Sequence, residues 1–151
     1  MGTLYVDTGG AATNSGSRDA NNAALSGSAA TVAAAVISLL TDNPDLSGVD
    51  ATAGSATQDT IHLNDATNTN QKIFWIIGKD NTAGVKTITV SVAPTGVVSS
   101  AWAIGGRHVW TAASVEAALR AGDTVVINNS PASASGAADF LTMRVAGTSA
   151  A

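Results

Sequence analysis

The sequence predicts a mainly β single domain, and three observations support this fold class. Ala, Gly, Ser and Thr supply 78 of the 151 residues, so layers of the fold can approach one another closely. The segment KIFWII at residues 72–77 is almost entirely β-branched or aromatic, which favours a strand. Residues 85–92 alternate strictly between two sets of side chains, as expected of a strand with one buried face.

Turn and cap residues divide the chain into expected elements. The loop DNTAG at residues 80–84 joins two strand-like segments, so residues 72–92 are expected to form a β-hairpin. One short helix is expected at about 112–120, because Thr111 suits an N-cap and Gly122 a C-terminal stop. Other strands are expected at residues 4–7, from about 34 to 40, 60–63, 100–104, 108–110, 123–128 and 140–145.

The expected domain spans residues 1–151, with a flexible arm at about 11–22 and a frayed tail at about 147–151. A β-helix-like coil or a small β-sandwich would accommodate the strands. The motif Asn-x-x-Leu-Ser-Gly at residues 22–27 recurs at 43–48, an offset within the range of one β-solenoid coil. Chance similarity in so biased a composition is the other interpretation of this repeat.

Charge and composition exclude several classes of function. Only 12% of the residues are charged, and the net charge is −4. Nucleic acids and anionic membranes are bound through clustered cations, so neither is an expected partner. The chain has no Cys, and its first residues do not form a signal peptide. A soluble protein made in a cytoplasm is expected.

No residue pattern indicates catalysis, so the chain is predicted not to be an enzyme and to use no cofactor and no metal. Asp45 and Asp50 could suggest a calcium loop, but the spacing is not that of an EF-hand, and Asx turns explain them better. His62 and His108 lack a nearby carboxylate pattern and are interpreted as strand or surface histidines.

The three Trp residues allow two interpretations. They could form a platform on which a sugar stacks, or they could fill the small core of an Ala-rich fold. Trp75 is expected to be the most buried, because it lies in the strongest strand segment. Trp110 is expected to be the most exposed. The candidate interface residues are Trp110, Arg107, His108 and Trp102.

Two segments resemble a known structural group. LYVDTGGAATNSGS at residues 4–17 resembles the entry segment of right-handed parallel β-helix proteins. ASVEAALRAGDTVVI at residues 113–127 is similar to the capping helix and first strand of the same group. Together with residues 72–77 and 101–107, these segments are similar to bacteriophage virion proteins.

The resemblance implies a virion structural protein, namely a capsid decoration (cement) protein whose partner is the major capsid protein lattice. It also implies a trimer, while the small core favours oligomerisation in general. None of the catalytic clusters of β-helix lyases and hydrolases is matched. The alternatives are a head-binding or adaptor domain of a phage tail fibre or tailspike, and a carbohydrate-binding module.

Overall fold

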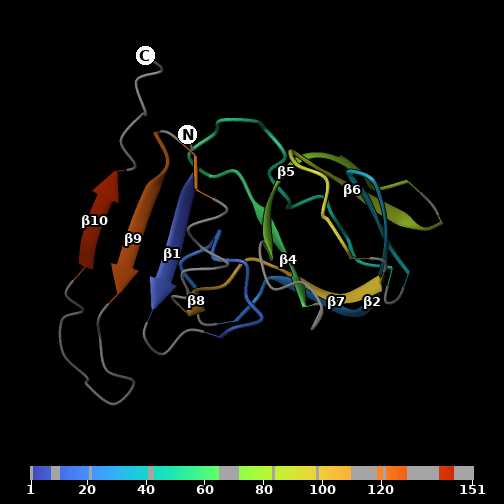
Figure 1. Ribbon diagram of the computed structural model, residues 1–151, viewed down its shortest axis with the longest axis horizontal. Helices are drawn as coiled ribbons and strands as arrows, with labels where there is room; N and C mark the ends of the chain where they lie inside the picture. The colour runs from blue at the N-terminus through green and yellow to red at the C-terminus, as the bar shows by residue number, and fades with distance from the viewer. Residues whose placement is uncertain are drawn as a thin grey trace.

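The computed structural model describes residues 2–7, 11–20, 22–40, 43–64, 72–82, 84–97, 99–109, 119–120, 122–128 and 140–144. These residues form ten strands, arranged as a closed six-stranded barrel beside a four-stranded sheet (Figure 1). The predicted mainly β fold class is therefore confirmed.

Six strands close the barrel through antiparallel pairs, in the order β2-β3-β6-β5-β4-β7. Closure pairs both sides of every strand, so the barrel has no free edge. The strands are β2 (Leu25–Ala33), β3 (Val36–Leu39), β4 (Thr60–Asn64), β5 (Ile73–Asp80), β6 (Lys86–Val90) and β7 (Ser99–Ile104).

The second sheet joins segments from the two halves of the chain. Its strands are β1 (Thr3–Asp7), β8 (His108–Val109), β9 (Thr124–Asn128) and β10 (Phe140–Arg144), in the order β10-β9-β1-β8. β1 runs parallel to both β8 and β9, whereas β10 is antiparallel to β9. The sheet therefore depends on contacts between residues more than 100 positions apart.

Two hydrophobic cores hold the molecule together. The barrel core includes Ile37, Leu39, Ile61, Ile88 and Trp102. A second, smaller core lies between the outside of the barrel and the four-stranded sheet, a contact named here the sheet–barrel interface. Its members are Leu4 and Val6 from β1, Ile73 and Trp75 from β5, and Val125 from β9. β5 is thus buried on both faces, which explains its nearly continuous apolar sequence.

The expected coil or sandwich is not the architecture of the described residues. A β-helix stacks parallel strands, whereas parallel pairing here is confined to β1 and its two neighbours, with one further bridge from Ala11 to His108. The barrel is built from hairpins: Ala33 pairs with Val36, so only Ala34 and Ala35 connect β2 to β3. So short a connection permits only antiparallel pairing.

The predicted hairpin at residues 72–92 is confirmed by the antiparallel pairing of β5 with β6. The predicted helix is not seen: residues 119–120 are not helical, and 112–118 lie outside the described residues. Of the two interpretations of the recurring motif, chance similarity agrees with the structure. The first copy enters strand β2, whereas residues 43–48 form a loop and turn.

Residues 11–20 of the expected arm lie against the rest of the fold. Ser15 is fully buried, and its Oγ accepts a hydrogen bond from the Gly105 backbone N–H at 2.7 Å. The Gly16 N–H donates to the Gly106 carbonyl at 2.8 Å. Gly105 and Gly106 both have positive φ, and a Cβ at Gly106 would lie within 2.6 Å of the Asn14 amide. This glycine turn lets the segment pack closely. The tail at 147–151 lies outside the described residues.

The described residues contain no helix that is long and apolar enough to cross a membrane.

Candidate functional site

Of the four predicted interface residues, the structure describes three: Trp102, Arg107 and His108. Trp102 is buried in the barrel core, and His108 is buried at the edge of the sheet–barrel interface. Arg107 is half-buried and forms ion pairs with Asp19 at 2.7 Å and Asp7 at 3.4 Å. Trp110 lies outside the described residues. Trp102 and His108 therefore offer no side chain to a partner in this fold.

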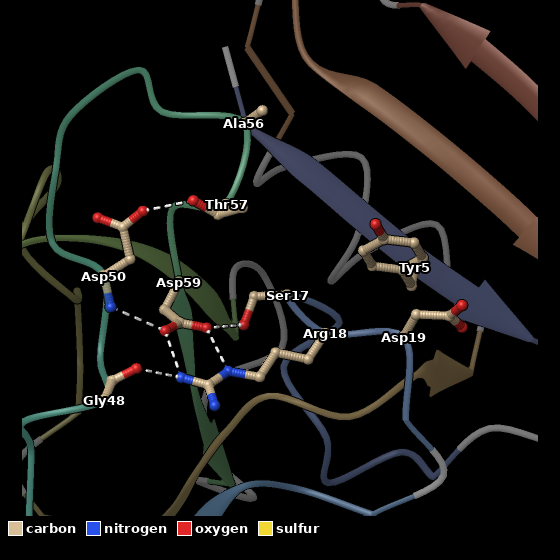
Figure 2. Close-up of a pocket in the computed structure, with 9 residues that line it drawn as sticks. All are labelled: Tyr5, Ser17, Arg18, Asp19, Gly48, Asp50, Ala56, Thr57 and Asp59. Carbon is tan, nitrogen blue, oxygen red and sulfur yellow. Dashed lines mark hydrogen bonds and ion pairs between the residues drawn. The ribbon is translucent and has the colours of Figure 1, made fainter.

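One cavity lined by charged and polar residues has a volume of about 360 Å³ and lies between β1 and the loop that precedes β4 (Figure 2). Asp59, only 1% exposed, is at its base. The Asp59 carboxylate accepts hydrogen bonds from Arg18 Nε at 3.0 Å, Arg18 Nη2 at 2.7 Å, Ser17 Oγ at 2.8 Å and the Asp50 backbone N–H at 2.9 Å. The hydrogen bonds to Asp59 raise the pKa of Arg18. We name Ser17, Arg18, Asp50 and Asp59 the Asp59 cluster.

The Asp59 cluster joins three loop segments rather than presenting a reactive group. Arg18 also donates to the Gly48 carbonyl at 2.7 Å, which ties the segment before β2 to the loop before β4. Tyr5 and Asp19 line the opposite side of the cavity (Figure 2). Every polar atom of the Asp59 carboxylate is occupied by a donor from this chain. The arrangement is that of a structural ion pair.

The predicted Asx turns are confirmed. Asp45 accepts the Ser47 N–H at 2.9 Å, and Asp50 accepts the Thr52 N–H at 2.8 Å. Hydrogen bonds from the Thr52 backbone and the Thr57 hydroxyl lower the pKa of Asp50 to about 2. Among the described residues, no group of three or more His, Cys, Asp or Glu side chains is placed to hold a metal ion.

A second cavity, also of about 360 Å³, is lined without any ionisable side chain. Its floor includes the small residues Gly27, Ala101 and Ala103. We name it the neutral cavity. Asn and hydroxyl side chains stand around this floor, contributed by Thr13, Asn14, Asn22, Ser26 and Asn64. Such a site can only recognise a ligand through neutral hydrogen bonds and shape.

The largest exposed apolar side chains gather on three neighbouring strands. All five in the described part of the chain lie on β3, β6 and β5 or within two residues of their ends: Val36, Leu40, Ile77, Val85 and Val92. We name this surface the outer barrel face. In Figure 1, β6 lies on the side of the barrel away from the four-stranded sheet.

Strand register places most of these residues at two ends of the face. At one end, Val36 pairs with Thr89, and Thr89 pairs with Gly78, which follows Ile77. At the other end, the pairing of Leu39 with Lys86 places Leu40 beside Val85. The exposed apolar residues are therefore distributed over three adjacent strands, with Thr89 between Val36 and β5.

The barrel strands carry very little charge. Only three charged residues lie in the six strands, Lys79, Asp80 and Lys86. The Lys86 side chain is buried, and its Nζ donates to the carbonyls of Asn81 and Thr82. Lys79 Nζ donates to three carbonyls of the loop at residues 46–49. Both cations are thus used to hold loops.

A scan of protein-family models, a search of curated proteins and a search of solved structures each gave no match to this chain. Function is therefore inferred from the geometry of the chain itself.

The sequence analysis missed both the Asp59 cluster and the outer barrel face. Arg18 and Asp59 are 41 residues apart, and no local pattern relates them. The outer barrel face had a visible signal. Residues 85–91 alternate, with Val85, Thr87 and Thr89 on a face free of charge. What could not be predicted is that β3 and β5 lie on either side of β6 and extend this face.

Proposed function

We propose that this protein is a virion structural protein that binds a repeating protein lattice, as a capsid decoration protein does. The outer barrel face carries this proposal. It combines all five exposed large apolar side chains of the described residues with strands in which both lysines are used to hold loops and Asp80, at the end of β5, is the remaining charged residue. The cores of protein–protein interfaces are depleted in charged residues in the same way.

The barrel supports docking through a face rather than through a strand edge. A closed barrel has no unpaired strand to add to a partner sheet, so contact must use outward side chains. Val36, Ile77 and Val85 are held on paired strands or at their ends, and binding would order little additional backbone. Exposed apolar side chains that gather on one part of a surface are a feature of interaction sites.

The use of charge within the fold also supports a structural role. Arg18, Arg107 and Arg120 each form an ion pair with a carboxylate of the same chain. Lys79 and Lys86 donate instead to backbone carbonyls of the chain. Binding to a lattice requires only shape and apolar contact, with avidity from many attachment points.

Homo-oligomerisation, with a trimer as the expected form, is part of the proposal. Each copy has a net charge of −4, so approach between copies is favoured only where charge is absent. A trimer would also present several outer barrel faces to one lattice. Light scattering at micromolar concentration should give a mass near three times 14.9 kDa, and a 14.9 kDa species would contradict oligomerisation.

A charged side chain placed on the outer barrel face should weaken binding to the lattice. Ile77→Lys and Val85→Lys each bury an unpaired cation at the contact, so co-sedimentation with particles lacking this chain should weaken at least tenfold. Ala53→Lys adds the same charge on an exposed loop and is the matched control. Equal binding by all three variants would contradict docking through this face.

A carbohydrate-binding module is the second candidate, and the neutral cavity is the observation that favours it. Trp75 and Trp102 are buried, so neither supplies an exposed stacking platform. The amide and hydroxyl groups around the neutral cavity could instead bind sugar hydroxyls. Because Trp102 lines this cavity, a bound glycan should quench Trp fluorescence in a saturable way. Loss of this quenching in Asn64→Leu would support a carbohydrate-binding function. Unchanged fluorescence would exclude it.

A further inference from the structure

Two histidines meet where the four-stranded sheet joins the barrel. His62 lies in β4 and His108 in β8, and each is 1% exposed. Their ring centroids are 5.5 Å apart, with an angle of 37° between the ring planes. β8 pairs with β1 through Val6, a member of the sheet–barrel interface. The pair therefore forms a contact between the barrel and the second sheet.

The imidazole side chain of His62 is buried without any hydrogen bond. Neither its Nδ1 nor its Nε2 has a partner, although both atoms are inaccessible to solvent. A neutral imidazole leaves one donor and one acceptor unsatisfied there, whereas an imidazolium would leave two donors and a charge. His108 differs, because its Nδ1 donates to the Asn14 carbonyl at 2.6 Å. The neutral form of His62 is thus the only one the site tolerates.

The charged groups around the pair disfavour protonation. Burial, followed by the nearby charges of His108 and Lys72, lowers the pKa of His62 to about 3. Burial also lowers the pKa of His108, with a smaller contribution from Lys72, while the hydrogen bond to Asn14 opposes the shift. Of the strands packed around the pair, β1 contributes Asp7, whose carboxylate is held by Arg107. β7 contributes no charged side chain.

We propose that the His62–His108 contact is acid-sensitive and controls the attachment of the four-stranded sheet to the barrel. When both rings are neutral, they pack as part of the sheet–barrel interface. When they are protonated, two cations and Lys72 face one another in a buried site. Separation of the sheet from β4 restores water to both rings. The barrel keeps its own core and all its strand pairs, so it remains folded.

The direction of the pH dependence follows from the lowered pKa of His62. The separated state has an ordinary histidine pKa of 6.5 and takes up the proton first. The contact is therefore at full strength above pH 6.5 and weakens as the pH falls from 6.5 to about 3. His62 alone should raise the separated population about 30-fold between pH 7.5 and 5.0, and His108 adds to this. Above pH 5, most carboxylates stay ionised, so histidines dominate the effect.

Hydrogen exchange tests the proposal on the full chain. After correction for the intrinsic pH dependence of exchange, residues 2–7 and 122–128 should lose protection about 30-fold or more between pH 7.5 and 5.0. Residues 73–80 and 86–90 should keep theirs. In His62→Phe, which preserves a planar ring but cannot be protonated, the loss should be at least tenfold smaller. Asp45→Asn removes an exposed carboxylate and should behave as the wild type.

Two results would overturn the proposal. One is equal protection of residues 2–7 in the wild type at the two pH values, a measurement that does not depend on any variant folding. The other is an equal loss of protection in the barrel and in the sheet, which would show global unfolding instead of separation. If His62→Phe does not fold, His62→Gln removes the same titration, and a wild-type pH response in it would also count against the proposal.

Discussion

At the residue scale, the charged side chains of this protein act mainly as connectors between segments distant in sequence. Arg120 donates to Asp123 and Gln58, and its guanidinium lies 4.1 Å from the centre of the Trp75 ring. Arg18 likewise forms an ion pair with Asp59, which lies 41 residues further along the chain. With so few charged residues in the chain, each such pair carries an unusually large share of the tertiary polar contacts.

The Asp59 cluster gives a prediction at this scale. Asp59→Asn replaces one carboxylate oxygen by a donor, which then faces Arg18 or Asp50 N–H instead of accepting from it. The free energy of unfolding should fall by about 2–4 kcal/mol, as measured by urea denaturation. Asp45→Asn is the matched control, because an exposed Asn can form the same Asx turn, so its stability should match that of the wild type. Equal effects of the two variants would show that the Asp59 ion pair stabilises nothing.

At the scale of elements, local pattern predicted most strands but not their partners. β5 and β6 were predictable because β-branched and aromatic residues and a turn motif lie together in the sequence. β2 was missed, because LSGSAATVA has few residues that favour strands. Its neighbours supply the stabilisation: β3 through a tight turn, and β7 through Trp102. Closure of the barrel and the parallel pairs of β1 depend on long-range contacts that no local pattern encodes.

A prediction also follows for Gly27 of β2. Glycine disfavours a strand, but the packing of Trp102 on β7 leaves no room for a side chain at this position. Gly27 pairs with Trp102, and a Cβ at position 27 would lie 2.5 Å from Trp102 Nε1. The Trp102 ring is buried and cannot move aside, so Gly27→Ala should lower the free energy of unfolding by about 1–3 kcal/mol in thermal or urea denaturation. Gly48→Ala is the control: nothing lies within 4 Å of a Cβ there, and its stability should match the wild type. A fully stable Gly27→Ala would contradict this packing.

At the scale of the whole molecule, the two halves of the fold have different roles. The barrel carries exposed apolar side chains on or next to β3, β6 and β5, while the four-stranded sheet covers β5 at Trp75 through Leu4 and Val125. Under the proposed function, the barrel docks through the exposed side chains, and the sheet covers the part of β5 that holds Trp75. The sequence indicated a protein poor in reactive groups and suited to packing against proteins. It could not indicate which surface does so, because that surface exists only once β3, β6 and β5 are assembled.

The most direct test of docking through the outer barrel face is a cryo-electron microscopy map of virions purified from the source of the chain. A decoration protein should give density for the six-stranded barrel at many equivalent lattice positions, with Val36, Ile77 and Val85 of the outer barrel face against the capsid. Density at the tail alone would instead indicate a fibre adaptor. Absence of the chain from the particles would contradict the proposed virion role. Attachment with the outer barrel face exposed to solvent would contradict docking through that face.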